Sequence, residues 1–123
     1  MPDNISIQEI KSKIEEFVRD RNWGQYHSPK NISMSIAIEA AELMEHFQWL
    51  TIEQSKKLLK DKIKREAIED ELADIAIYVL DFCNAFDINI EKSILRKLEK
   101  SSKKYPIHLA KGRADKYTHY RDK

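Results

Sequence analysis

Apolar residues recur at helical spacing along most of the chain, and this pattern predicts a fold made of helices. A first helix should begin near Ser6, a residue type that commonly caps helices, and should end near Asn22 or Gly24. Five apolar side chains recur along it at helical spacing: Ile7, Ile10, Ile14, Phe17 and Val18.

The segment at 23–31 combines Gly, Pro, Ser and Asn with two aromatic residues, which is typical of a loop. A second helix, capped by Asn31 or Ser33, should then continue to about Trp49. Its stretch MSIAIEAAELM has almost no polar face. Most of this helix is therefore expected to pack against other helices.

Three further helices follow from capping and breaking signals. Thr51 can cap a short third helix, with Gln54 placed to complete a capping box. A longer fourth helix should cover 62–85. A fifth should follow the break at Asp87 and should end before Pro106.

The tail at about 104–123 has no sustained apolar period and is expected to be basic and extended. Two glycines and three prolines in 123 residues leave few turn signals for a sandwich or a barrel. The expected fold is therefore all-α, a bundle of about five helices in a single domain over residues 1–123. A chain this short buries only a modest core, so oligomerisation is also expected.

The net charge of +1 conceals an uneven distribution. Nine acidic and three basic residues lie between Asp61 and Glu91, whereas ten basic and three acidic residues lie between Arg96 and Lys123. This order fits a site in which a metal ion and an anion are held by different segments. A single cysteine, Cys83, excludes an intrachain disulfide. No signal peptide or membrane span is recognisable, so a cytoplasmic protein with no membrane partner is expected.

Two carboxylates interrupt the apolar run of the second helix. Glu39 and Glu42 are three positions apart, which places their Cβ atoms about 5–6 Å from each other on one face. An ionised carboxylate in an apolar environment has to be paired, bind a cation or give up its charge. The two residues are therefore candidate metal ligands.

The fourth helix repeats this arrangement. Glu71 and Asp74 are three positions apart in an apolar run, and Tyr78 follows on the same face. Two such pairs on facing helices can supply four carboxylates to one or two divalent ions. Because all the donors are oxygens, Mg²⁺ is expected, with Mn²⁺ as a possible substitute. A ferritin-like di-iron site requires Glu-x-x-His motifs, and Glu45 stands where such a histidine would be.

Such a site suits the cleavage of a phosphoanhydride, because bound divalent ions neutralise phosphate charge and activate a water. Glu39 is the candidate for orienting or deprotonating the attacking water. His27, in the loop before Pro29, is a candidate substrate contact, whereas His46 is expected at the surface. Basic and hydroxyl groups of the last segment are candidates for the phosphates: Lys103, Lys104, Tyr105, Lys111, Arg113, Lys116 and Tyr117.

Four blocks of sequence resemble the MazG-like nucleotide pyrophosphohydrolases and, within them, the dCTP pyrophosphatase branch. In chain order they are RNWGQYHSPKN, IEAAELMEHFQW, EDELADIAIYVL and KKYPIHLAKGRADKY. The resemblance covers most of the chain. It implies an all-α bundle that forms homotetramers or homodimers, with sites near the subunit contacts. It also implies hydrolysis of a nucleoside triphosphate between its α and β phosphates, giving the monophosphate and pyrophosphate.

The resemblance also assigns residues. The family's Mg²⁺ ligands correspond to Glu39, Glu42, Glu71 and Asp74. Two tryptophans that sandwich the base correspond to Trp23 and Trp49, and Tyr78 matches a further position in the substrate pocket. Ser101 stands where family members often have Asn, so it is a candidate contact to phosphate or sugar. If the second helix continues to Trp49, the Trp49 side chain lies about 15 Å beyond Glu39 along the helix axis.

Two other interpretations remain open. A nucleic-acid-binding helical module could use the basic tail, with Tyr105, Tyr117 and Tyr120 stacking on bases. This hypothesis leaves the carboxylates in apolar runs unexplained, so nucleic acid is not the expected partner. A non-catalytic oligomeric scaffold is the second alternative, with Mg²⁺ or lysines merely neutralising the acids.

Overall fold

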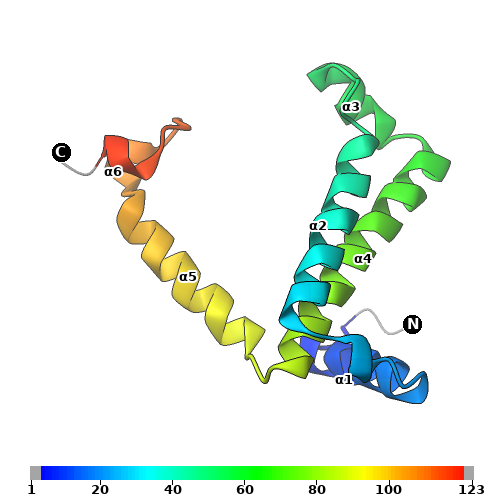
Figure 1. Ribbon diagram of the computed structural model, residues 1–123. Coiled ribbons are helices and arrows are strands. Elements are labelled where there is room, and N and C mark those ends of the chain that lie inside the picture. The colour runs from blue at the N-terminus through cyan, green and yellow to red at the C-terminus, as the bar shows by residue number, and fades with distance from the viewer. Residues whose placement is uncertain (1–3, 121–123) are drawn as a thin grey trace. The chain divides into compact units, whose positions relative to one another are not determined.

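The computed structural model describes residues 4–120, in which all regular structure is helical (Figure 1). The predicted all-α class is confirmed, with six α-helices in the described residues where about five were expected. They are α1 (Ile7–Asp20), α2 (Pro29–Glu45), α3 (Ile52–Leu58), α4 (Lys62–Ala85), α5 (Ile90–Lys104) and α6 (Ile107–Ala110). Two 3₁₀ turns accompany them: η1 (Gly24–Tyr26) and η2 (Tyr117–His119). Contacts divide the chain into two compact units, Met1–Asp87 and Ile88–Lys123.

Capping side chains set where the first two helices begin. The hydroxyl of Ser6 accepts a hydrogen bond from the backbone N–H of Glu9 at 3.1 Å, so the predicted start of α1 is confirmed. The predicted caps of α2, Asn31 and Ser33, are wrong. Ser28 caps this helix by accepting from the N–H of Asn31 at 3.0 Å, and a proline in the first turn favours this earlier start.

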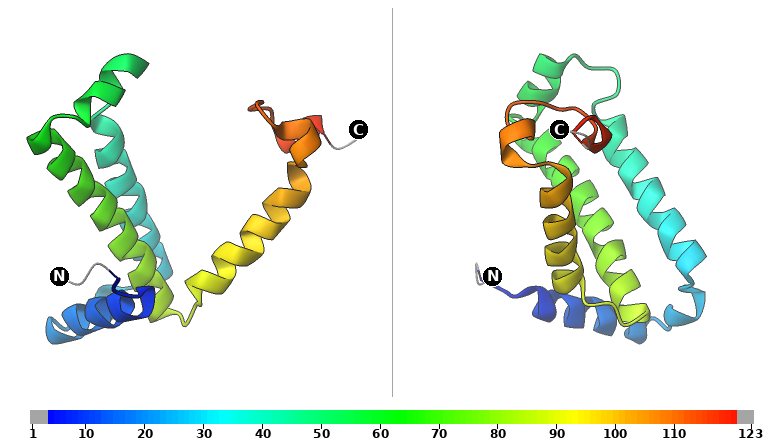
Figure 2. Two further views of the ribbon diagram at one scale, coloured as in Figure 1. Left: turned by 180° about the vertical axis from the view of Figure 1, so that it is seen from behind. Right: turned by 90° about the vertical axis from the view of Figure 1, so that its left-hand side faces the viewer.

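The first unit is built on a hairpin of α2 and α4, which run antiparallel along each other (Figures 1 and 2). The predicted end of α2 near Trp49 is wrong, because the backbone tightens into turns after Glu45 and the N–H of His46 bonds the carbonyl of Leu43. The capping box of Thr51 and Gln54 is confirmed. It starts α3, which lies at the far end of the hairpin in Figure 1.

Helix α1 packs against α4 near the start of α2 (Figure 2). The side-chain amide of Asn84 on α4 donates to the backbone carbonyl of Lys11 on α1 at 2.9 Å. Among the described residues of this unit, few apolar side chains are buried: Ile14, Ile32, Ile68 and Cys83. Within residues 4–120, none of the helices combines the length and the apolar composition of a membrane-crossing segment.

The second unit contains α5, α6 and η2. Asn89 caps α5 by accepting from the N–H of Lys92 at 3.0 Å. The expectation of an extended tail is wrong for the described residues, because the rings of Tyr117 and Tyr120 pack edge-on against Tyr105, with centroids 6.4 and 6.1 Å away. These aromatic contacts fold the chain back after α5. Residues 121–123 of the predicted tail lie outside the described part.

Candidate metal centre

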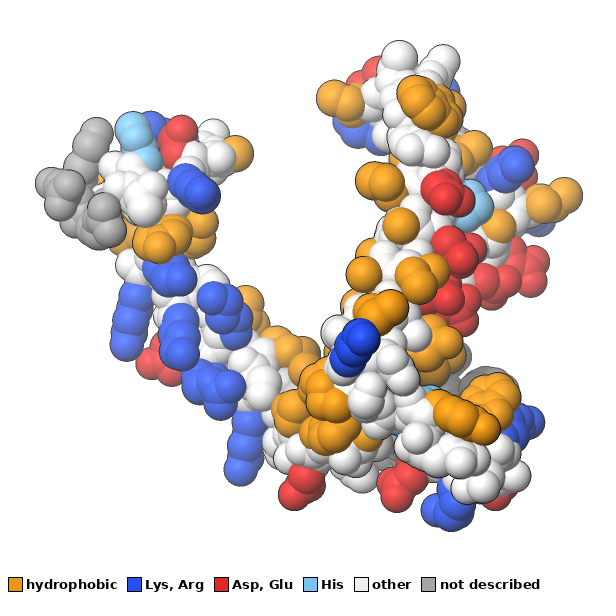
Figure 3. All heavy atoms as spheres, in the orientation of Figure 1, with side chains coloured by type: hydrophobic (Ala, Val, Ile, Leu, Met, Phe, Trp, Pro, Cys, Tyr) orange, Lys and Arg blue, Asp and Glu red, His pale blue; other side chains and the backbone are white. Residues whose placement is uncertain are grey.

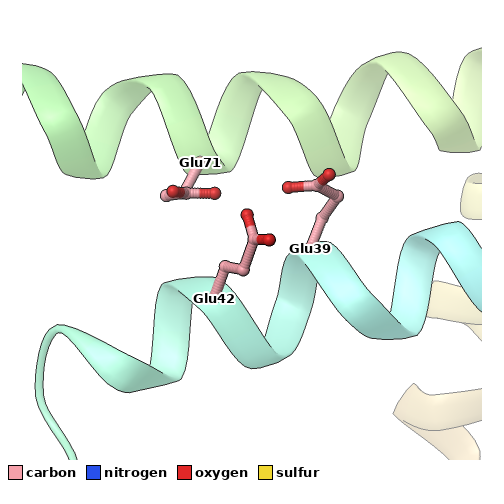
Figure 4. A group of neighbouring side chains, drawn as sticks. All are labelled: Glu39, Glu42 and Glu71. Atoms are coloured by element: carbon pink, nitrogen blue, oxygen red, sulfur yellow. The ribbon is translucent and has the colours of Figure 1, made fainter.

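The hairpin brings three of the four predicted carboxylates together. Glu39 and Glu42 project from α2 toward α4, and Glu71 projects from α4 toward α2 (Figure 4). One carboxylate oxygen from each residue can be chosen so that all three lie within 4.8 Å of one another. Oxygen atoms at these separations can bind the same cation.

Burial and the neighbouring carboxylates raise the pKa values of Glu39 and Glu71. The pKa of Glu39 is raised to about 7, chiefly by burial, then by a hydrogen bond with Glu42 and by the negative charges of Glu42, Asp74 and Glu71. Burial also raises the pKa of Glu71, together with a hydrogen bond and charge repulsion from Glu42 and repulsion from Asp74. His46 opposes the shift of Glu71. A cation would relieve this mutual repulsion.

Two oxygens in the cluster lack partners. Oε2 of Glu39 and Oε2 of Glu71 are shielded from solvent, and neither has a hydrogen-bond partner among the described residues. A shielded acceptor without a partner is costly, and a bound cation would satisfy both atoms. The cluster therefore fits a divalent cation held by oxygen ligands, as the sequence predicts.

Asp74 lies beside the cluster but outside the group of three. Its side chain is exposed, and its charge contributes to the raised pKa values of Glu39 and Glu71. It follows Glu71 by three residues on α4, close to one helical turn. Its role as a fourth ligand stays a prediction.

A cleft of about 390 Å³ opens beside the carboxylates, and the sequence analysis missed two of its residues. Glu45 and His46 line it together with Glu42 and Glu71. His46, expected at the surface, is half-buried here. Its spacing of four residues from Glu42 could have revealed it, because positions four apart share a helix face. In Figure 3, acidic side chains gather along the right-hand side of the hairpin.

The two candidate base-binding tryptophans lie at opposite ends of α2. Trp23 precedes η1, is 44% exposed, and meets Phe17 of α1 edge-on with ring centroids 5.6 Å apart. Trp49 follows α2 in the turn before α3 and is 87% exposed. Because α2 has 17 residues, it separates the two segments by about 25 Å. Both rings are accessible, and they do not face each other within one chain.

His27 and Tyr78 are both half-buried. Nδ1 of His27 lies 2.9 Å from Oδ2 of Asp81 on α4, so this side of the imidazole is occupied by the protein itself. Tyr78 follows Asp74 by four residues and therefore faces the same side of α4. The sequence analysis missed Asp81, although it follows Tyr78 by three residues and so lies near the same side of α4.

Comparison with known families decides the assignment. Residues 34–119, most of the chain, match the MazG-like family. The chain belongs to the MazG-like family. The relationship predicted from four sequence blocks is thereby confirmed, and the clustered carboxylates Glu39, Glu42 and Glu71 fall inside the matched region.

Individual relatives agree with this MazG-like assignment. The dCTP pyrophosphatase 1 of Bos taurus is 32% identical over 113 residues, which are 92% of this chain and 67% of that protein. The Homo sapiens dCTP pyrophosphatase 1 is 30% identical over 92% of this chain and 66% of its own length. The chain thus spans about two thirds of these relatives. The crystal structure of a pyrophosphatase from Archaeoglobus fulgidus superposes with a TM-score of 0.78 at 36% identity, covering 86% of this chain and 97% of that one.

The candidate phosphate-binding residues of this MazG-like chain lie in the second unit. Lys103 and Lys104 line a cavity of about 450 Å³ together with Tyr117 and Tyr120. Nζ of Lys104 lies 4.6 Å from the centre of the Tyr117 ring. The other candidates do not line this cavity: Ser101 is half-buried, and Tyr105, Lys111 and Lys116 are exposed. Basic side chains follow α5 in Figure 3.

Arg113 has partners within the second unit. Its Nε lies 2.7 Å from Oδ2 of Asp115, and its Nη2 lies 2.8 Å from Nε2 of His119. These contacts hold the guanidinium against the aromatic cluster, because Arg113 also lies 5.6 Å from the centre of the Tyr120 ring. Arg113 therefore contributes to the local structure of the tail.

The metal-free chain should gain more stability from Mg²⁺ at pH 8 than at pH 5. The pKa of Glu39 rises from 4.5 to about 7 in the folded chain, so its stabilising contribution is complete below pH 4.5 and is lost as the pH rises through 7. A cation needs the ionised carboxylate and reverses this loss at high pH. Thermal unfolding with and without Mg²⁺ measures the effect, and Glu39→Gln is the control that should reduce its pH dependence. Equal stabilisation at both pH values would contradict the assignment.

Proposed function

We propose that this MazG-like chain hydrolyses a deoxynucleoside triphosphate, dCTP or a modified dCTP, between the α and β phosphates in a Mg²⁺-dependent reaction. The products would be the monophosphate and pyrophosphate. The predicted enzyme class, a nucleoside triphosphate pyrophosphohydrolase, is confirmed by the family and by the relatives named dCTP pyrophosphatase 1. The observation that carries the metal-dependent mechanism is the cluster of three carboxylates with two unpartnered oxygens.

The carboxylates have distinct roles in this proposal. Glu39, Glu42, Glu71 and Asp74 would hold the ion. When bound, Mg²⁺ supplies neutralisation of phosphate charge and a water of lowered pKa. Glu39 would orient the attacking water or take its proton, and a pKa near 7 in the metal-free chain shows how strongly its surroundings favour a proton on this carboxylate.

Each of the two units carries residues that the sequence predicts as substrate contacts. The phosphate tail would contact Lys103, Lys104 and Tyr105, with Ser101, Lys111 and Lys116 as further candidates. Trp23, Trp49 and Tyr78 would form the base and sugar pocket, and the exposed rings of both tryptophans support their part in it.

A cytoplasmic location likewise remains a prediction.

The positions of the two tryptophans bear on assembly. Because they lie at opposite ends of α2, a base held between both of them requires Trp23 from one copy of the chain and Trp49 from another. Exposed apolar side chains on the hairpin would be covered in such an assembly: Met34, Ile38, Met44, Leu72 and Ile77. A homotetramer is the proposed state, with a homodimer as the alternative.

A panel of triphosphates tests the proposed substrate. Wild-type protein with Mg²⁺ should convert dCTP or a base-modified dCTP with a higher kcat/KM than it converts dATP, dGTP or dTTP. Chromatography of the products identifies the monophosphate. Failure to hydrolyse any member of the panel would favour the non-catalytic scaffold, and salt-sensitive oligonucleotide binding without hydrolysis would favour the nucleic-acid-binding module.

A further inference from the structure

A buried contact between a histidine and an aspartate joins the loop after α1 to α4, the helix that carries Glu71 and Asp74. Nδ1 of His27 lies 2.9 Å from Oδ2 of Asp81, and their side chains are only 16% and 6% exposed. His27 ends the η1 turn, whereas Asp81 lies in the last two turns of α4. The contact therefore links two segments that are 54 residues apart in the sequence.

A gain in the stability of the fold does not by itself account for the contact between His27 and Asp81. Burial raises the pKa of Asp81, and the proximity of His27 opposes that shift. A buried ion pair can often be replaced by apolar side chains of similar volume without loss of stability, because desolvation offsets most of the attraction. What such a pair supplies in addition is a defined distance and direction between the two segments.

The loop that His27 anchors carries Trp23. The N–H of Tyr26 donates to the carbonyl of Trp23 at 2.9 Å, and the N–H of His27 donates to the carbonyl of Gly24 at 3.1 Å. The N–H of Trp23 donates to Val18 of α1 at 3.1 Å. Trp23 and His27 therefore belong to one hydrogen-bonded turn, and displacement of His27 would be transmitted to the tryptophan.

Asp81 lies on the same side of α4 as the candidate metal ligands of that helix. It follows Asp74 by seven residues, which is close to two full turns of α4, so both project from the same side of the helix about 10 Å apart. Glu71 lies one further turn away. A contact fixed to Asp81 is thus fixed relative to the metal ligands on α4.

We propose that His27 and Asp81 are positioning residues, which set the place of the Trp23 ring relative to the metal ligands on α4. The inference rests on the proposed function, in which Trp23 contacts the base of the substrate while the carboxylates hold the metal at its phosphates. Neither residue acts on the reacting atoms. Loss of the pair should weaken substrate binding more than it slows the chemical step.

Steady-state kinetics with dCTP and Mg²⁺ test this role. His27→Ala and Asp81→Leu each remove the contact, and each should raise KM about tenfold (about 1.4 kcal/mol) with little change in kcat. Asp81→Asn retains an acceptor oxygen for the imidazole and should keep KM close to that of the wild type. The double variant His27→Ala/Asp81→Leu should be no worse than either single variant, because both lose the same contact.

Asn84→Leu is the matched control. It removes a hydrogen bond that joins the same end of α4 to Lys11 of α1 rather than to the loop. It should lower the thermal unfolding temperature and leave KM unchanged. A wild-type KM in folded Asp81→Leu or folded His27→Ala would overturn the proposal, as would effects that multiply in the double variant. An increase in KM for His27→Ala alone would overturn it too, since His27 would then act without Asp81. Absence of pyrophosphate release by the wild-type protein would instead contradict the proposed function.

Discussion

Replacing Glu71 by Gln should lower turnover by several orders of magnitude while the fold persists, and Asp74→Asn should do the same. The amide is nearly the same size as the carboxylate, so the packing between α2 and α4 is retained. It lacks the negative charge that holds a divalent cation. Rates of pyrophosphate release measure the loss, and circular dichroism verifies that each variant is helical.

Glu69→Gln provides the matched control for this prediction. Glu69 lies on the same helix two residues before Glu71, is exposed, and pairs with Arg65 at 3.0 Å. An exposed pair of this kind contributes little to stability, so the variant should retain wild-type turnover. Full activity in Glu71→Gln and Asp74→Asn would refute the carboxylate site, whereas equal losses in all three variants would point to a general effect of charge.

Trp23→Ala and Trp49→Ala should each raise KM for the preferred triphosphate about tenfold or more, with less effect on kcat. Stacking of a base on an aromatic side chain is worth about 1–3 kcal/mol, and about 1.4 kcal/mol corresponds to a factor of ten. Inorganic triphosphate, which has no base to stack, should be a poor substrate for the wild type and for both variants.

A mixture of the two variants tests whether the base pocket is shared between chains. After the two proteins are unfolded and refolded together, about a quarter of the pockets should combine an intact Trp23 from one chain with an intact Trp49 from another. These pockets should show the wild-type KM. If each chain held a base between its own two tryptophans, no mixed assembly would regain that KM. Unchanged KM and base preference in both single variants would make the tryptophans structural.

The parts of the fold that could be predicted are those set by neighbouring residues. Ser6 and Thr51 cap their helices through contacts within four residues, and the break at Asp87 coincides with a left-handed backbone angle, φ 54°. The carboxylate cluster was predictable for a related reason. Glu39 and Glu71 stand in apolar runs, where an acidic side chain needs a partner.

The features that were missed depend on contacts between distant residues. Apolar residues continue at helical spacing past Glu45, so periodicity gave no sign of the turns that separate Trp49 from α2. The aromatic cluster of Tyr105, Tyr117 and Tyr120 has no periodic signature at all. Asp81 was missed because its partner, His27, lies in a loop whose position relative to α4 only the folded chain reveals.

The central claim is that a cation held by Glu39, Glu42, Glu71 and Asp74 allows this chain to cleave a nucleoside triphosphate between its α and β phosphates. Phosphorus NMR of dCTP incubated with the wild-type protein tests it directly. With Mg²⁺ present, the triphosphate signals should be replaced by equal amounts of dCMP and pyrophosphate, and chelation of the metal should abolish the reaction. Formation of dCDP and inorganic phosphate, or unchanged hydrolysis after chelation, would contradict it.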